Sequence, residues 1–137
     1  MSYEFFEHTA DVKFKSRGKT IEEAFINSAS ALFETIRGEI KILESIEKTI
    51  EVEGTDIANL LHNFLEEFLF LLDSQDFLAS RIVELKLDKE NLKLSARVVG
   101  DEAKKYTFTN DVKAVTYNEM SVLEEDGQFV CTVVLDV

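Results

Sequence analysis

The stretch IANLLHNFLEEFLFLL, residues 57–72, decides the fold because it is the most apolar of the expected helices. Its large apolar side chains recur with a helical period, and Thr55 or Asp56 is placed to cap its first turn. Leu69 and Phe70 widen the apolar stripe, so we expect this helix to be more buried than the helix that precedes it. Burial of one Leu or Phe contributes roughly 1.5–3 kcal/mol, which makes this helix a large part of the core.

Upstream, a second helix is predicted between Thr20 and Gly38. Glu23 follows Thr20 by three residues, which is the spacing of a capping box, and Gly38 is a natural C-terminal cap. The segments before and between the two helices alternate in hydropathy, as half-buried strands do. These strands are expected at residues 3–6, 11–16 and 46–53.

Downstream, the chain is expected to form four strands. Residues 82–87 and 92–99 flank a polar turn, and residues 112–123 lead through Asp126-Gly127 into 128–137. Residues 129–135 are apolar at nearly every position, which indicates a central strand buried on both faces. The expected order is β-β-α-β-α-β-β-β-β, an α+β fold with two helices packed on one face of a mixed sheet. Residues 1–137 form a single domain in this interpretation.

The composition limits the classes of partner. The net charge is −12, from 27 acidic and 15 basic residues, so a large nucleic-acid footprint is not expected. The charge suits a basic protein partner, a cation or solubility alone. The one cysteine, Cys131, lies in an apolar run, which favours a buried residue in a reducing compartment. The start of the sequence lacks signal-peptide features, and Asn63, Glu66 and Glu67 interrupt the apolar helix, so we expect a cytoplasmic protein without a membrane span.

Familiar catalytic motifs do not occur. The sequence has no Gly-rich phosphate loop, no HExxH and no CxxC. Its two histidines are far apart, and His62 lies beside an apolar stripe, which favours a structural or surface role. Lys113, Thr116 and Tyr117 form a polar group in a strand, which an exposed strand face explains equally well.

Asp136 is harder to explain by local structure, because it follows a strongly apolar run. Together with the carboxylate of Val137 it forms a dense anionic group with oxygen ligands only, which suits a hard cation such as Ca²⁺ or Mg²⁺. From the residues alone, a cation site and a solvated acidic end both remain open. Asp11 shares a strand face with Lys13 and Lys15, where a surface ion pair worth under about 1 kcal/mol is the simplest reading.

Several strings taken together resemble the archease family nearly end to end. Two are fairly specific: His-Thr-Ala-Asp at residues 8–11 and Lys-Ala-Val-Thr-Tyr at residues 113–117. The others are Thr20-Ile21-Glu22-Glu23-Ala24-Phe25, Asp56-Ile57-Ala58-Asn59-Leu60-Leu61 and Leu135-Asp136-Val137.

The resemblance implies a function and a site. Archeases assist the GTP-dependent RNA ligase that joins tRNA exon halves, promoting its guanylylation and multiple turnover without ligating RNA themselves. A non-enzymatic activator of that ligase, with no direct nucleic-acid or membrane contact, is therefore expected. The resemblance also implies a divalent-cation site at Asp11, Asp136 and Val137, with calcium as the first choice and Mg²⁺ or Mn²⁺ as alternatives.

Two departures and two alternatives accompany this resemblance. Asn118 stands where many archeases have a histidine, and residues 100–106 lack the family's Asp-Pro-x-Arg-His segment. The first alternative is a metal-dependent nucleotide or phosphoester hydrolase, which the lack of a positioned base and phosphate clamp disfavours. The second is a general chaperone or adaptor that uses its acidic surface.

Overall fold

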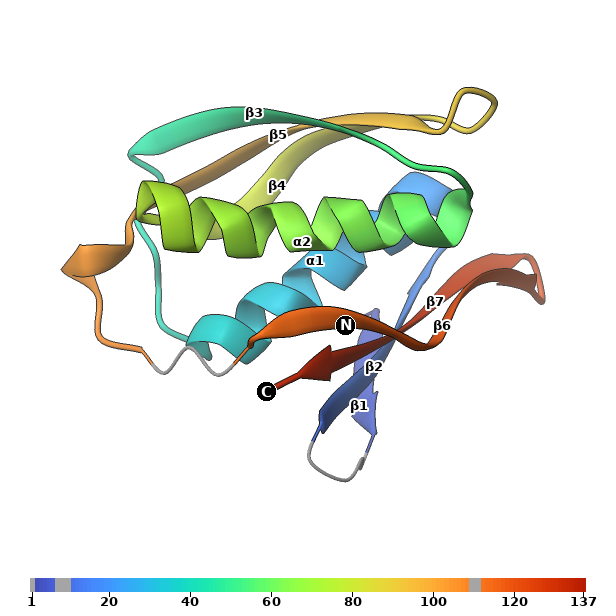
Figure 1. The fold of residues 1–137 in the computed structure, drawn as a ribbon, viewed down its shortest axis with the longest axis horizontal. Helices are drawn as coiled ribbons and strands as arrows, with labels where there is room; N and C mark the ends of the chain where they lie inside the picture. The colour runs from blue at the N-terminus through green and yellow to red at the C-terminus, as the bar shows by residue number, and fades with distance from the viewer. Residues whose placement is uncertain (1, 7–10, 109–111) are drawn as a thin grey trace.

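The computed structural model describes residues 2–6, 11–108 and 112–137, and they form three layers, with the two helices between two sheets (Figure 1). The predicted order of elements is confirmed within these ranges. Their bounds are β1 (Tyr3–Phe6), β2 (Asp11–Gly18), α1 (Ile21–Arg37), β3 (Ile46–Glu53), α2 (Ile57–Gln75), β4 (Phe77–Asp88), β5 (Lys93–Glu102), a short 3₁₀ turn η1 (Ala103–Lys105), β6 (Ala114–Glu125) and β7 (Gln128–Asp136).

The α+β class is confirmed, but the strands form two antiparallel sheets where the sequence suggested one mixed sheet. The orders are β1-β2-β7-β6 and β3-β5-β4. The physical reason lies in the helices, whose buried residues cover more of the circumference than one sheet can screen from water. Each helix accordingly contacts strands of both sheets.

The predicted helix ends agree with the structure. Thr20 caps α1 by accepting a hydrogen bond from the Glu23 N–H at 3.1 Å, and Gly38 ends that helix with φ of +68°. For α2 the cap is Asp56, whose carboxylate accepts from the Asn59 N–H at 2.8 Å. The side chains of Thr20 and Asp56 each accept a hydrogen bond from a first-turn N–H that has no partner within the helix.

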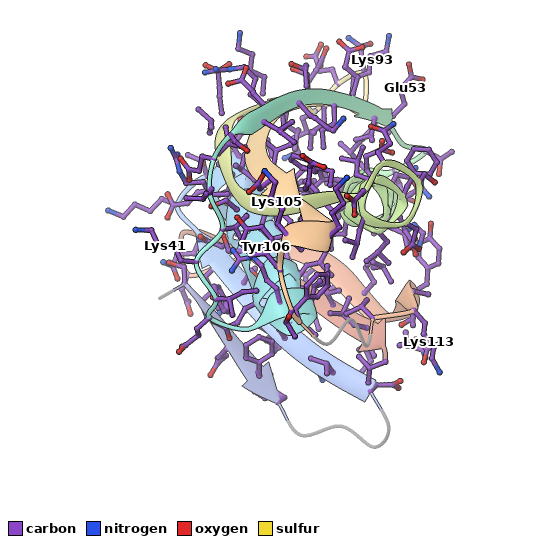
Figure 2. The ribbon with its side chains drawn as sticks, turned by 90° about the vertical axis from the view of Figure 1, so that its left-hand side faces the viewer. Lys41, Glu53, Lys93, Lys105, Tyr106 and Lys113 are labelled. Carbon is purple, nitrogen blue, oxygen red and sulfur yellow. The ribbon has the colours of Figure 1, made fainter. Side chains whose placement is uncertain are left out.

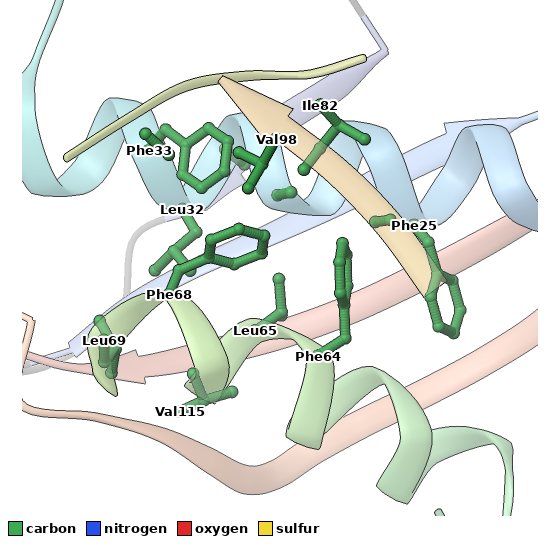
Figure 3. Packing of buried hydrophobic residues seen from close by; sticks show 14 of the residues in the cluster. Phe25, Leu32, Phe33, Phe64, Leu65, Phe68, Leu69, Ile82, Val98 and Val115 are labelled. Atoms are coloured by element: carbon green, nitrogen blue, oxygen red, sulfur yellow. The ribbon is translucent and has the colours of Figure 1, made fainter. Parts of the chain in front are cut away.

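Aromatic side chains of α1 and α2 pack together in the core between the two helices (Figure 3). Phe25 of α1 stacks on Phe64 of α2 with ring centroids 6.1 Å apart. Phe68 packs edge-to-face against both Phe64 and Phe33, at 5.2 and 4.8 Å. These contacts hold the two helices together, and the buried residues of α2 confirm the large core contribution expected of residues 57–72.

The helix α2 lies between two edge strands, β6 and β3. On the β6 side, Val115 donates its N–H to Glu66 at 2.9 Å, and its carbonyl lies 2.8 Å from His62 Nε2. On the β3 side, Asn63 donates to the Glu53 carbonyl at 2.8 Å. Side chains of α2 thus form hydrogen bonds with backbone groups of the two edge strands that have no partner strand on that side. The structural role predicted for His62 is confirmed.

The expectation for Phe70 is wrong, although Leu69 beside it is buried. Phe70 is 53% exposed, because α2 turns this position away from both sheets. The double-sided burial expected for β7 is confirmed, since its residues 130–135 are all buried. Burial raises the pKa of the Cys131 thiol to about 12. No helix in the described ranges has the length and apolar character needed to cross a bilayer.

Candidate metal centre

Asp11 and Asp136 lie directly opposite each other in the antiparallel pair of β2 and β7. Directly opposed residues share a face of the sheet, with Cβ atoms roughly 4.5–5.5 Å apart. The expectation that these two aspartates, from the two ends of the chain, are neighbours is therefore confirmed.

Strand alternation explains where this aspartate pair points. Phe14 of β2 is buried against the helix layer, so Asp11 and Lys13 belong to the other face of the sheet. The backbone of Asp136 is also held from its second side, because its carbonyl accepts the Lys113 N–H at 2.7 Å. Asp136 therefore occupies a fixed position between β2 and β6.

The chemistry of this group fits a hard cation. Two carboxylates directly opposite each other on a sheet repel, and Val137, the next residue along, offers a main-chain oxygen. All the donors are oxygens, which is the set that Ca²⁺ and Mg²⁺ take. In the described part of the chain, no three His, Cys, Asp or Glu side chains come together as a metal cluster, so such a site depends on the main-chain donor as well.

A bulge in β6 borders the aspartate pair. Residues 117–120 interrupt the pairing with β7 between Thr116 and Ser121, and Glu119 has φ of +56°. Across β7, Glu119 forms an ion pair of 2.7 Å with Lys13. Bulges re-aim side chains beside functional sites. Nothing in the local sequence, such as a glycine, indicated this one.

Three polar residues noted in the sequence, Lys113, Thr116 and Tyr117, lie near or within this bulge. Thr116 donates its hydroxyl to the Val134 carbonyl at 3.0 Å. Tyr117 turns to α2, where its ring stacks on His62 at 4.2 Å and its hydroxyl accepts from Asn59 at 2.6 Å. Lys113 is exposed near the start of β6. These three residues therefore serve separate contacts.

A second carboxylate, Asp101, was missed by sequence reasoning. It is completely buried and accepts hydrogen bonds from Ser45 at 2.6 Å and Tyr106 at 2.7 Å. The Glu102 N–H at 2.8 Å and the Lys105 ammonium at 3.3 Å add to these. The hydrogen bonds, with that of Ser45 first, hold the pKa of Asp101 well below its usual range. Figure 2 shows Lys105 and Tyr106 together at this end of the molecule.

The segment 100–106, which departs from the family pattern, therefore builds an internal anchor of its own. Its signal in the sequence was an aspartate followed within five residues by a lysine and a tyrosine, which is too common to predict burial. The residues His8, Thr9, Ala10 and Asp111 of the sequence motifs lie outside the described residues.

Comparison with known proteins identifies the family. The model of the archease protein family (MTH1598/TM1083) matches residues 3–137. Proteins named "Protein archease" from Sulfurisphaera tokodaii and Pyrococcus abyssi are 33% and 36% identical to this chain, and each alignment covers 98% of both chains.

Two solved structures share the fold. The solution structure of Methanobacterium thermoautotrophicum protein 1598 is 34% identical, covers 99% of both chains and superposes with a TM-score of 0.85. A Thermotoga maritima archease, described as a possible chaperone, is 20% identical over 96% of this chain and 94% of its own, with a TM-score of 0.67, and supports the fold alone. The chain belongs to the archease family.

Proposed function

We propose that this protein activates a GTP-dependent tRNA-splicing RNA ligase, promoting its guanylylation and multiple turnover in the joining of tRNA exons. Family membership supports this proposal, and one observation carries it: Asp11 and Asp136 face each other at the ends of two paired strands. Like charges directly opposite each other destabilise a sheet, so their placement favours a role in binding.

The proposed site takes a divalent cation, with calcium first and Mg²⁺ or Mn²⁺ as alternatives. Asp11 and Asp136 would supply side-chain oxygens, and Val137 would supply its main-chain carboxylate. A bound cation would offset the repulsion between the carboxylates. The chain contributes the geometry, because the register of β2 and β7 holds both carboxylates before the cation arrives.

The hydrolase alternative has weaker support. A general base would have to lie beside the aspartate pair, but Lys13, which shares that face of the sheet, is paired with Glu119. The ring of His62 contacts Val115 and Tyr117. Incubating the pure protein with nucleotides and a phosphoester tests this alternative directly. Turnover that Asp136→Asn removes would favour the hydrolase over the activator.

The activator proposal is tested by multiple-turnover ligation of tRNA halves with the cognate ligase. We expect the parent protein to raise the number of turnovers, and Asp136→Asn to lose that stimulation. Glu124→Gln, an exposed carboxylate on the β6–β7 hairpin, is the matched control and should behave as the parent does. Equal stimulation by Asp136→Asn would contradict the proposed site, and no stimulation by the parent would contradict the proposed function.

A further inference from the structure

Phe70 lies at an open hollow on the exposed side of α2. The hollow has a volume of about 380 Å³ and separates the middle of α2 from the end of β3. Its lining residues are Val52, Glu53, Asn63, Glu66, Glu67 and Phe70. Phe70 is 53% exposed there, and large aromatic side chains presented in this way are the typical anchors of protein interfaces.

Every charged residue of the hollow is acidic, but their environments differ. Glu66 accepts a backbone hydrogen bond from Val115, and Glu53 lies 3.9 Å from Lys93. Glu67 has neither a hydrogen bond nor an ion pair with any described residue, and partial burial raises its pKa. A cation that pairs with a partly desolvated carboxylate has a stronger electrostatic interaction than one that pairs with a fully exposed carboxylate.

The strand beside the hollow is open on one side. Within its sheet β3 pairs with β5 and forms the edge. Among the residues that the structure describes, the contact of Asn63 with the β3 backbone lies near the end of the strand, at Glu53. An extended chain can add to such an edge while its side chains enter an adjoining groove. Figure 2 looks along α2, with Glu53 at the end of β3 on one side of the helix and Lys113 on the other.

We propose that this hollow and the open edge of β3 form a docking site for an extended basic segment of a protein partner. A lysine or arginine of that segment pairs with Glu67, while its aliphatic stem packs on the ring of Phe70. Three carboxylates exclude an RNA strand from the same place. A second copy of this chain is an unsuitable occupant, because both copies carry a net charge of −12.

This inference rests on the proposed function for the identity of the partner, the RNA ligase, and gives that partner a surface apart from the aspartate pair. Among the described residues, the hollow touches β6 only through Glu66, which accepts the Val115 N–H. None of its lining residues is Asp11, Asp136 or Ala114, the residue opposite Asp136. Docking and cation binding therefore use different residues and can be disabled one at a time.

The test measures binding of immobilised cognate ligase to the parent and to four variants in saturating calcium. Phe70→Ser should weaken binding about tenfold or more, which corresponds to the loss of an interface anchor. Glu67→Gln should weaken it about threefold and reduce its salt dependence. The matched controls are Leu123→Ser, whose side chain is also 53% exposed, and Glu124→Gln, both on the β6–β7 hairpin. Both controls should bind as the parent does.

The outcomes separate the two proposals. Parental binding by both Phe70→Ser and Glu67→Gln overturns the docking site and leaves the activator function standing. Failure of the ligase to bind the parent overturns both. A parent that dimerises through this face, with Phe70→Ser monomeric and its ligase binding unchanged, would show that a second copy is the occupant and also overturns the inference. Circular dichroism and thermal unfolding establish that each variant is folded, as expected for substitutions at exposed positions.

Discussion

Two groups of aspartates in this molecule have opposite surroundings. Asp101 is completely buried, and four donors from Ser45, Glu102, Lys105 and Tyr106 converge on its carboxylate. Asp11 and Asp136 instead stand opposite one another at the open ends of β2 and β7. The first arrangement stabilises a charge with the protein's own groups, and the second brings two like charges together.

The difference distinguishes a structural carboxylate from carboxylates placed for a ligand. Hydrogen bonds to a charged group are stronger than neutral ones, so Asp101 ties the loop around Ser45 to the end of β5. Opposed like charges repel, so the two aspartates destabilise each other in the apoprotein. We therefore expect substitution of Asp101 to affect stability, and substitution of Asp11 or Asp136 to affect function.

The largest expected effect is on activity. Asp11→Ala and Asp136→Ala should each abolish stimulation of the RNA ligase, because each removes a proposed ligand. Loss of even an outer-sphere partner of a metal ligand costs roughly 10–100-fold in affinity or activity, and loss of a ligand should cost at least as much. Ligation time courses at excess substrate measure this effect. If either variant stimulates the ligase as the parent does, the aspartate pair is not a functional site.

The next effect is on stability and concerns Asp101→Asn. An amide cannot replace the carboxylate that accepts from Ser45, Tyr106 and Lys105, so the free energy of unfolding at neutral pH should fall clearly. Urea unfolding monitored by circular dichroism measures the loss. Glu90→Gln, in the exposed β4–β5 turn, serves as the control and should be neutral.

The pH dependence sharpens that second prediction. The pKa of Asp101 is lowered in the folded state, so its contribution to stability is complete above the unfolded pKa of about 3.9 and is lost as the pH falls through the folded value. The stability difference between parent and Asp101→Asn should therefore stay constant from pH 7 to about pH 5 and narrow below about pH 4. A difference that grows on acidification would show that Asp101 is not the stabilising ion inferred here.

A smaller effect is expected from extending the chain after Val137. The extension converts the proposed carboxylate ligand into a neutral amide, whose carbonyl oxygen can bind Ca²⁺ without contributing charge. Calcium affinity and ligase stimulation at limiting calcium should both fall, whereas the same extension before Met1 should leave them unchanged. Equal calcium affinity in the two fusions would show that the site uses only side chains.

The smallest expected signal is RNA binding by the isolated protein. With a net charge of −12 the chain repels phosphates, and Lys104 and Lys105 are already paired with Asp101 and Glu102. Gel shifts with tRNA halves at physiological salt should show no specific complex. Association with the ligase should slow as salt rises, because it is assisted by charge. Low-micromolar RNA binding would favour direct action on the substrate.

Sequence patterns predicted the elements well where one local interaction decides the outcome. Thr20, Gly38 and Asp56 act through hydrogen bonds or dihedral angles within a few residues, and the apolar run of β7 leaves few alternatives to a central strand. The division into two sheets could not be predicted in this way, because it depends on how much of each helix both sheets cover together.

In the candidate site, too, the sequence predicted the features that depend on local patterns and missed those that depend on distant partners. The alternation in β2 placed Asp11 on the polar face, but only the family resemblance brought it to Asp136, since cross-strand register is a property of the whole sheet. Asp101 and the β6 bulge at Glu119 escaped prediction because both depend on partners far away in the sequence. Phe70 was misjudged because hydrophobicity alone does not distinguish a core residue from an exposed anchor.

The central claim is that the aspartate pair is a cation site and Asp101 is a structural anchor. The most direct test is the free energy of unfolding, with and without calcium, of the parent and of Asp11→Asn, Asp136→Asn and Asp101→Asn. Calcium at about 100 times its dissociation constant should stabilise the parent by about 2.7 kcal/mol. Asp101→Asn should start less stable and gain as much, whereas Asp11→Asn and Asp136→Asn should be no less stable than the parent in chelator and should gain little from calcium. An equal gain in all four proteins, or none in the parent, would contradict the claim.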